Sequence, residues 1–174
     1  MNPRRRRFLA LGAGLALARP AWSALPERRL ALVNLHTGEA LDVVYWAQGA
    51  YLDEALAALA HLMRDHRSGE TGPMAPALFD VLHDLAQSLN ATGPIEIVSA
   101  YRSPATNAWL AENTSGVAKA SLHSRGMAAD VRLPQRPLED LYRAALGLRA
   151  GGVGLYPGSG FVHVDLGRVR SWVG

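Results

Sequence analysis

Apolar residues recur along this chain at two spacings, and the spacing separates helices from strands. Where they return every three or four positions, as from Leu52 to Met63 and from Leu78 to Leu89, they form one buried face of a helix. Pro104 can open a further helix in its first turn. The pattern predicts helices over 51–66, 76–89, 105–112 and 137–148.

Shorter apolar runs bounded by Gly, Pro and polar residues are typical of strands. A hairpin is predicted over 28–46, with its turn at 36–39, and further strands over 95–98, 126–133, 153–155 and 161–166. Residues 113–120 are polar and are expected to form a loop. Because most helices precede most strands, we expect an α+β fold with a small, mostly antiparallel sheet and flanking helices.

The first 24 residues differ from the rest and indicate an export signal. Arg4 to Arg7 precede an apolar run over 8–18, and the small residues Ala21, Ser23 and Ala24 follow it. Residues 5–9, Arg-Arg-Arg-Phe-Leu, resemble a twin-arginine signal. An ordinary secretory signal and an uncleaved anchor are the alternatives. We therefore expect a leader over 1–24, one domain over 25–174, a periplasmic location and no other membrane-spanning stretch.

Charge and cysteine content exclude two classes of function. The formal charge of +3 comes from the leader, because five of the 18 basic residues and none of the 15 acidic ones lie before Leu25. The remainder is slightly acidic, so we expect no nucleic-acid binding. The chain has no cysteine, which excludes disulfides and thiolate metal sites.

Two histidines and one aspartate are candidate ligands for a zinc ion. His123 and Asp130 lie seven positions apart with small residues between them, and His163 lies on a predicted strand near the C-terminus. Three such ligands leave a fourth position open for water, which is the catalytic zinc pattern. Spacing alone is a weak signal, since a strand histidine is usually a hydrogen-bonded core residue.

Asp165 is predicted to share the face of His163, because side chains two apart on a strand point the same way. It could act as a general base, orient a metal ligand, or pair with a buried cation. As a fourth ligand beside His123, Asp130 and His163, it would instead close the site and make the metal structural.

Several motifs together resemble the M15 metallopeptidases, in an exported bacterial branch of that family. They are Ser99-x-Tyr101-Arg102-Ser103, Ser121-x-His123-x-x-Gly126-x-Ala128-x-Asp130, Gly152-Val153-Gly154-x-Tyr156-Pro157 and Phe161-Val162-His163-Val164-Asp165. The likeness extends to residues 34–39 and 64–70, and so covers nearly all of the chain after the leader.

This resemblance implies the M15 zinc peptidase fold and one zinc ion per chain, held by His123, Asp130 and His163. It also implies hydrolysis of peptide bonds in peptidoglycan. Arg102 is expected to hold a substrate carboxylate or to stabilise the oxyanion, or else to form a structural salt bridge. Tyr101 and Ser121 are expected to bind substrate, with loop support as the alternative for Ser121.

One departure from the family concerns the proton-transferring group. Many relatives carry Glu or Asp three positions before the last histidine, or His two before it, where this chain has Gly160 and Phe161. Neither can accept a proton, so Asp165 is the predicted substitute base. His36 is interpreted as a turn residue, and His61, His66 and His83 as structural or solvated.

The leading hypothesis is an endopeptidase that cleaves peptidoglycan cross-links. A carboxypeptidase that trims stem peptides is the enzymatic alternative. A wall-binding module that keeps the zinc pocket without turnover is the alternative from another class.

Overall fold

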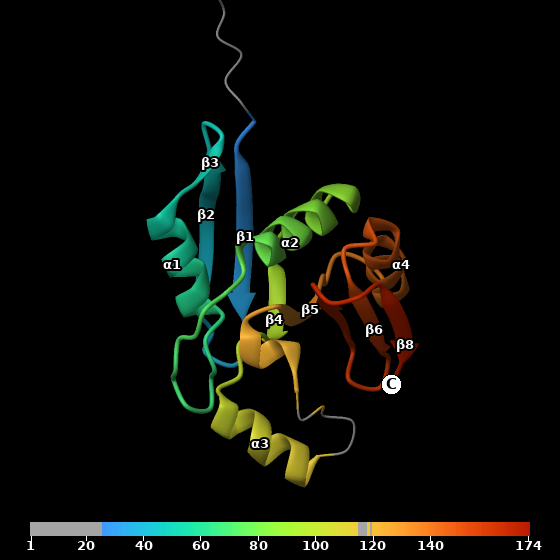
Figure 1. Ribbon diagram of the computed structural model, residues 1–174. Coiled ribbons are helices and arrows are strands. Elements are labelled where there is room, and N and C mark those ends of the chain that lie inside the picture. Colours follow the sequence, from blue (N-terminus) through green and yellow to red (C-terminus); the bar gives the residue numbers. More distant parts are fainter. Residues whose placement is uncertain (1–25, 115–117, 119) are drawn as a thin grey trace, which may run out of the picture.

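The computed structural model describes residues 26–114, 118 and 120–174, so the predicted leader lies outside the described residues. One sheet crosses the molecule, with strands in the order β3-β2-β1-β4-β5-β7-β6-β8 (Figure 1). The strands are β1 (Arg28–Asn34), β2 (Ala40–Ala47), β3 (Ala50–Tyr51), β4 (Ile95–Ser99), β5 (Ala128–Arg132), β6 (Gly152–Tyr156), β7 (Phe161–Asp165) and β8 (Arg170–Val173). The helices are α1 (Asp53–Leu62), α2 (Pro76–Ser88), α3 (Pro104–Asn113), the 3-10 turn η1 (Leu122–Arg125) and α4 (Leu138–Leu148).

The α+β class is confirmed, but the expectation of a small, mostly antiparallel sheet is wrong. The sheet has eight strands and is mixed, because β1 pairs in parallel with β4 and β6 pairs in parallel with β8. Two helices separate β2 from β4, and this long crossover allows β4 to run in the direction of β1. The strand β8 was not predicted, since its residues Arg-Ser-Trp-Val are half exposed and carry no apolar run.

The first predicted helix is shorter than its apolar pattern. It ends at Leu62, not at position 66, because its last carbonyls find partners outside the helix. The Leu62 carbonyl accepts from Asn34 Nδ2 at 2.8 Å, and the Met63 carbonyl accepts from the Tyr101 amide at 3.0 Å. These bonds replace the helical ones that a continuation would have supplied.

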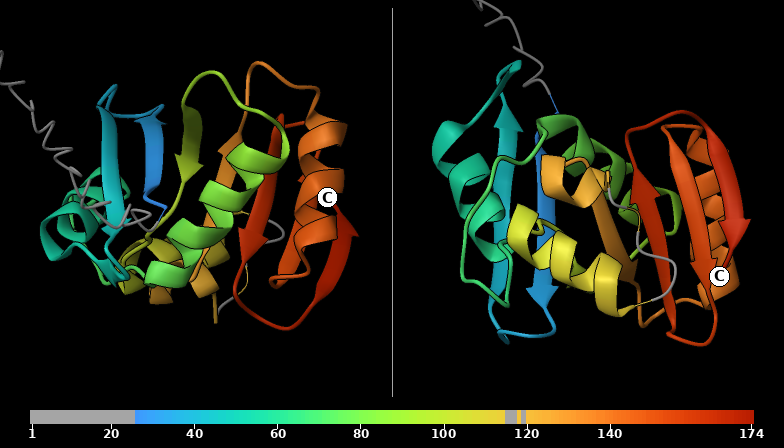
Figure 2. Two further views of the ribbon diagram at one scale, coloured as in Figure 1. Left: turned by 90° about the horizontal axis from the view of Figure 1, so that it is seen from above. Right: turned by 60° about the horizontal axis from the view of Figure 1, so that its bottom comes forward.

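The two faces of the sheet differ in chemistry near β5 and β7. Helices α2 and α4 lie side by side on one face, while α3 and η1 lie on the other (Figure 2). Ala129, Val131, Val162 and Val164 are buried in the main hydrophobic core. Because side chains alternate along a strand, the residues between them point to the opposite face, where α3 and η1 lie.

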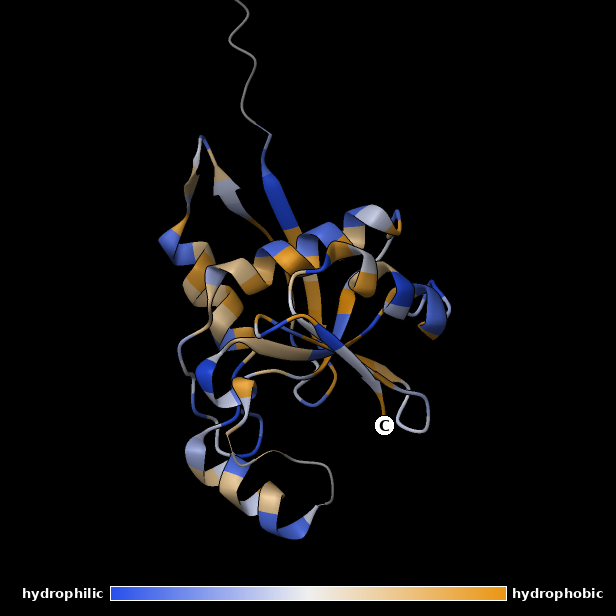
Figure 3. Ribbon diagram, turned by 45° about the vertical axis from the view of Figure 1, so that its right-hand side comes forward, coloured by the Kyte–Doolittle hydropathy of each residue, from blue (hydrophilic) through white to orange (hydrophobic). Residues whose placement is uncertain are grey.

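The hydrophobic core lies between the sheet and the helices that cover one of its faces. Its strand residues are largely hydrophobic, whereas α3 mixes hydrophobic and hydrophilic positions and stands apart from the core (Figure 3). Among the described residues, no helix is long and apolar enough to cross a membrane.

We predict that Asn34→Ala lowers the free energy of unfolding by about 2–4 kcal/mol, because several groups lose a buried partner. Asn34 Nδ2 donates to Leu62, and its Oδ1 accepts from the amides of His36 and Thr37. Chemical denaturation measures the change. Asn113→Ala, whose amide donates to the exposed carbonyl of Trp109, is the control and should change stability by less than about 0.5 kcal/mol. Equal effects of the two substitutions would contradict this assignment.

Candidate metal centre

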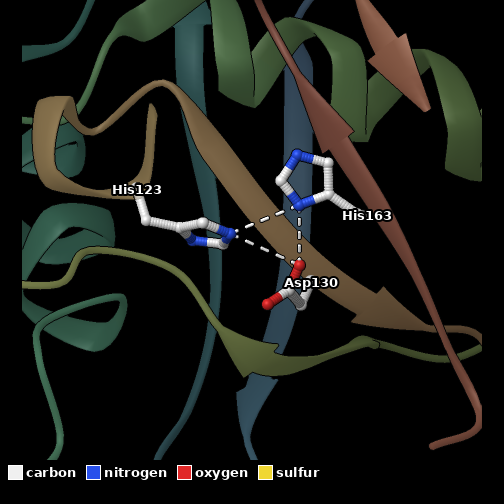
Figure 4. Close-up of side chains that lie close together, drawn as sticks. All are labelled: His123, Asp130 and His163. Carbon is white, nitrogen blue, oxygen red and sulfur yellow. Dashed lines mark hydrogen bonds and ion pairs between the residues drawn. The ribbon is translucent and has the colours of Figure 1, made fainter. Parts of the chain in front are cut away.

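The three predicted ligands come from three neighbouring elements and point toward one another (Figure 4). Asp130 on β5 lies directly opposite His163 in the antiparallel register of β7, so the sheet itself pairs their side chains. His123 reaches them from η1, which leads into β5. All three are nearly or fully buried.

The turn that carries His123 is fixed at both ends, which accounts for the Ser-x-His-x-x-Gly pattern. Ser121 caps its start by accepting a hydrogen bond from the His123 amide at 3.3 Å. Gly126 ends it with a φ of 62°, and a Cβ there would collide with the backbone of Pro73. Only glycine combines this left-handed conformation with such a close approach. The predicted loop-support role of Ser121 therefore has a structural basis.

Hydrogen bonds on the far side of each imidazole select which nitrogen faces the centre. His123 Nδ1 lies 2.7 Å from the Ala100 carbonyl, which can only accept, so Nδ1 carries the proton and Nε2 keeps its lone pair. His163 Nε2 lies 3.0 Å from Asp165 Oδ2 and donates to that carboxylate, which leaves Nδ1 facing Asp130. Two lone pairs and a carboxylate oxygen thus converge.

The spacing of these atoms fits a zinc ion. His123 Nε2 lies 3.3 Å from His163 Nδ1 and 3.4 Å from Asp130 Oδ1, and the last two atoms are 2.8 Å apart. Ligands at zinc bond lengths in a tetrahedron are roughly 3.3–3.6 Å apart, so two of these three separations match and the third is somewhat short. Three acceptors this close together require a cation or a proton between them.

Charge in the centre favours a cation. Burial lowers the pKa of His123, so its imidazole is neutral and able to ligate. Burial would raise the pKa of Asp130, but the neighbouring His123 and His163 outweigh it and hold that pKa well below its usual range. Burial would also lower the pKa of His163, but hydrogen bonds to Asp130 and Asp165 raise it on balance. The carboxylates that stabilise a proton on His163 would equally stabilise a metal ion in its place.

Asp165 has the environment of an orienting group rather than of a free base. Its Oδ2 contacts His163 and accepts from Arg170 Nη2 at 2.7 Å, while its Oδ1 accepts from the amides of Gly152 and Gly167 at 3.0 and 2.7 Å. Burial opposes its ionisation, but these hydrogen bonds outweigh it and keep the pKa of Asp165 below its usual range. It touches the nitrogen of His163 that points away from the centre, so it lies outside the group of converging ligand atoms.

Arg102 lies beside the centre and is held by two bonds. Its Nη2 donates to Asp130 Oδ2 at 2.8 Å, and its Nε donates to Ser99 Oγ at 3.0 Å. Burial lowers the pKa of Arg102, while the Asp130 carboxylate opposes that shift. Among the described residues, Nη1 has no hydrogen-bond partner, so this cation combines a structural ion pair with a free donor.

The ligands form part of the wall of a cavity of about 420 Å³. The wall also includes Tyr156, Arg170 and Trp172, for which the sequence predicted no role. Trp172 Nε1 donates to the Tyr156 hydroxyl at 2.9 Å, and the Arg170 guanidinium lies 4.9 Å from the Trp172 ring centre. These contacts depend on the strand β8 at residues 170–173, which pairs with β6. The short polar stretch gives no sequence signal for that strand, so the contacts were not predicted.

Tyr101 is the one predicted site residue that the structure does not bring to the cavity. Its ring is buried against Gly72, and its hydroxyl donates to Glu70 Oε1 at 3.0 Å. These contacts give Tyr101 a packing role and lend no support to substrate binding. Tyr101 and Arg102 are neighbours in the chain, but their side chains have different surroundings, because Tyr101 bonds Glu70 and Arg102 bonds Asp130. Adjacency to Arg102 therefore did not place Tyr101 in the cavity.

Comparison with known proteins shows the family to which this chain belongs. Residues 22–172 match the family model described as Peptidoglycan L,D-endopeptidase MepK, one of the M15 peptidases. The chain belongs to the M15 peptidase family. It is 42% identical over 176 residues to the Peptidoglycan L,D-endopeptidase MepK of Escherichia coli (strain K12), and the match covers 97% of this chain and 96% of that protein. It is 37% identical over 186 residues to the Probable peptidoglycan L,D-endopeptidase MepK of Haemophilus influenzae, and the match covers 100% of this chain and 98% of that protein.

Membership confirms the family expected from the motifs and makes the chain a hydrolytic peptidase of the metallopeptidase type. The likeness covers nearly the whole length of this chain and of those relatives.

We predict that His123→Ala lowers the affinity of this M15 peptidase for zinc by at least about 100-fold, because one of three converging ligands is lost. Calorimetry with a competing chelator measures the affinity and the stoichiometry. His61→Ala is the matched control, since His61 is exposed and lies outside the ligand group. Wild-type affinity in the His123 variant would exclude His123 as a ligand.

Asp165→Asn separates the orienting role from the general-base role. If Asp165 orients His163, the substitution lowers zinc affinity by about 10- to 100-fold, as expected for a group behind a metal ligand. Circular dichroism checks that the fold is kept, and Asp140→Asn on the exposed side of α4 is the control. Unchanged zinc affinity together with complete loss of peptidase activity would instead identify Asp165 as the base.

Proposed function

We propose that this chain is an exported, zinc-dependent peptidase that hydrolyses peptide cross-links in peptidoglycan. The observation that carries the proposal is the convergence of His123 Nε2, Asp130 Oδ1 and His163 Nδ1 in the wall of a cavity. Its relatives are named peptidoglycan L,D-endopeptidases, which supports peptidoglycan as the substrate and favours cleavage of an L,D bond.

In this proposal each residue has a distinct task. His123, Asp130 and His163 would hold one zinc ion, and Asp165 would keep His163 in the tautomer that can ligate. When bound, zinc would supply Lewis-acid chemistry, which lowers the pKa of a water to about 7 and polarises a carbonyl.

Arg102 stabilises the developing oxyanion through its free Nη1, while its bond to Asp130 holds the guanidinium in place. Such a fixed cation requires no reorganisation when charge develops, because Ser99 and Asp130 already restrain it. Ser121 shapes the turn that carries His123 and lines the same cavity.

The remaining proposals concern location. A substrate in the bacterial wall requires export, which agrees with a leader over 1–24 of the twin-arginine type and a periplasmic domain over 25–174. We propose no nucleic-acid partner, because the chain after the leader is slightly acidic.

Cleavage of purified peptidoglycan tests the proposal. The full chain is incubated with zinc, with a chelator, and as His123→Ala, and the released muropeptides are separated by mass. We expect cross-linked dimers to become monomers only with metal and with His123 present. Synthetic dimers that differ only in an L,D or a D,D linking amide then identify the bond, with the L,D form cleaved faster.

Two other outcomes would replace the proposal. Shortened stem peptides with dimers intact would indicate a carboxypeptidase. Stoichiometric zinc without any metal-dependent change in the wall would indicate a binding module.

A further inference from the structure

A second hollow, of about 210 Å³, adjoins the metal cavity and has a different lining. The two share four residues, Arg102, Thr114, Asp130 and Phe161. Beyond these shared residues, the second hollow is lined by His36, His66 and Arg67, with Val98, Ser99 and Leu110 completing its wall. A group bound in this second hollow would lie next to the metal centre, because the two cavities share part of their walls. We call this second hollow the basic hollow.

The histidines of the basic hollow meet although thirty positions separate them in the chain. His36 lies in the turn between β1 and β2, and His66 follows α1. Their rings stack at 3.7 Å between centroids and 13° between planes. The sequence predicts a turn position for His36 and a structural or solvated role for His66, and indicates no joint role for the pair.

Buried side chains fix the backbone on both sides of this stack. Asn34 Oδ1 accepts from the amides of His36 and Thr37. Asp65 Oδ1 accepts from the Arg67 amide at 2.9 Å, and Asp65 Oδ2 accepts from the Ser103 amide at 3.0 Å. The buried Asp65 carboxylate therefore fixes the Arg67 backbone next to the start of α3.

Among the described residues, Arg67 and the two imidazoles of the basic hollow keep hydrogen-bond donors without a partner, whereas Arg102 already donates to Ser99 and Asp130. Within the described part of the chain, no acidic side chain forms an ion pair with Arg67, and neither imidazole has a hydrogen-bond partner at its ring nitrogens. The one carboxylate in the lining, Asp130, is already bound by Arg102 and His163. The charge of Arg102 is thus balanced by Asp130, whereas Arg67 has no counter-ion among the described residues and stands beside two imidazoles with free ring nitrogens.

The titration of His66 agrees with a positive surrounding. Burial, and then the neighbouring His36 and Arg67, lower the pKa of His66 to about 4. The imidazole is therefore neutral near pH 7 and offers one N–H donor, while Arg67 and Arg102 supply the charge. The Arg67 charge also acts on Arg102, adding to the effect of burial in lowering its pKa.

We propose that the basic hollow binds a carboxylate of the substrate peptide, next to the bond that is cut. This inference rests on the proposed function and names a recognition element for it. Peptidoglycan stem peptides carry free carboxylates on their acidic residues, and a guanidinium with flanking N–H donors is a geometry suited to a carboxylate. The hollow thus selects substrates by charge, whereas the metal centre does the chemistry.

Arg67 is the residue to vary, because its side chain is exposed and its loss leaves the core intact. We compare wild type, Arg67→Ala and Arg67→Lys on two cross-linked muropeptides, one with free side carboxylates and one with these amidated. Arg143→Ala, an exposed arginine on α4 that lines neither cavity, is the matched control.

We expect Arg67→Ala to raise KM for the carboxylate form by about 10- to 100-fold with kcat within about threefold, the range for a charge-assisted hydrogen bond. Wild type should prefer the carboxylate form over the amidated form by a similar factor, and Arg67→Ala should lose that preference. Arg67→Lys should recover part of it. An unchanged preference in Arg67→Ala would overturn the proposal.

Binding without turnover keeps this test separate from the proposed function. Calorimetry on the chelator-treated full chain measures affinity for the same two muropeptides, whatever the enzyme cleaves. Tighter binding of the carboxylate form, lost in Arg67→Ala, supports the basic hollow even if no cleavage is found. Equal binding of both forms by wild type would exclude it, even if the peptidase activity is established. Competition by inorganic phosphate at similar concentration would show a general anion site and contradict carboxylate selection.

Discussion

The carboxylate of Asp130 is the point on which the site depends. It lies among two imidazoles and one guanidinium, at 2.8 Å from His163 and 2.8 Å from Arg102. Burying such a charge is unfavourable unless it is paired and hydrogen-bonded, so its neighbours are as necessary to the carboxylate as it is to them. The β5–β7 register supplies one neighbour, the segment after β4 a second, and η1 the third.

The ligands are carried by two kinds of element, the paired strands β5 and β7 and the turn η1. The core-facing residues of β5 and β7 pack under α2 and α4, and the alternate residues of the same strands carry the chemistry. The turn around His123 needs special backbone geometry, which Ser121 and Gly126 provide. Loss of core packing would therefore displace the strands β5 and β7 and, with them, the ligands Asp130 and His163.

Periodicity predicted the helices and most strands, because it is a local property of the chain. The zinc site at His123, Asp130 and His163 was predicted from the resemblance of several motifs to one family, since the spacing of the three donors alone is a weak signal. Prediction from the sequence failed where partners are distant in the chain. The end of the first helix depends on Asn34, the pairing of β8 depends on β6, and the surroundings of Asp165 depend on Arg170 and two backbone amides. The stack of His36 on His66 is likewise set by tertiary structure, and no spacing along the chain encodes it.

The two histidines present different nitrogens to the centre, Nε2 from His123 and Nδ1 from His163. The Nδ1 atom is nearer to its own backbone than Nε2 is, so the arm from the sheet is short and the arm from the turn is long. An ion in this centre would be held by His163 through a short connection to the sheet and by His123 through a longer connection to the turn. The two histidines are therefore not interchangeable, although they are the same residue type.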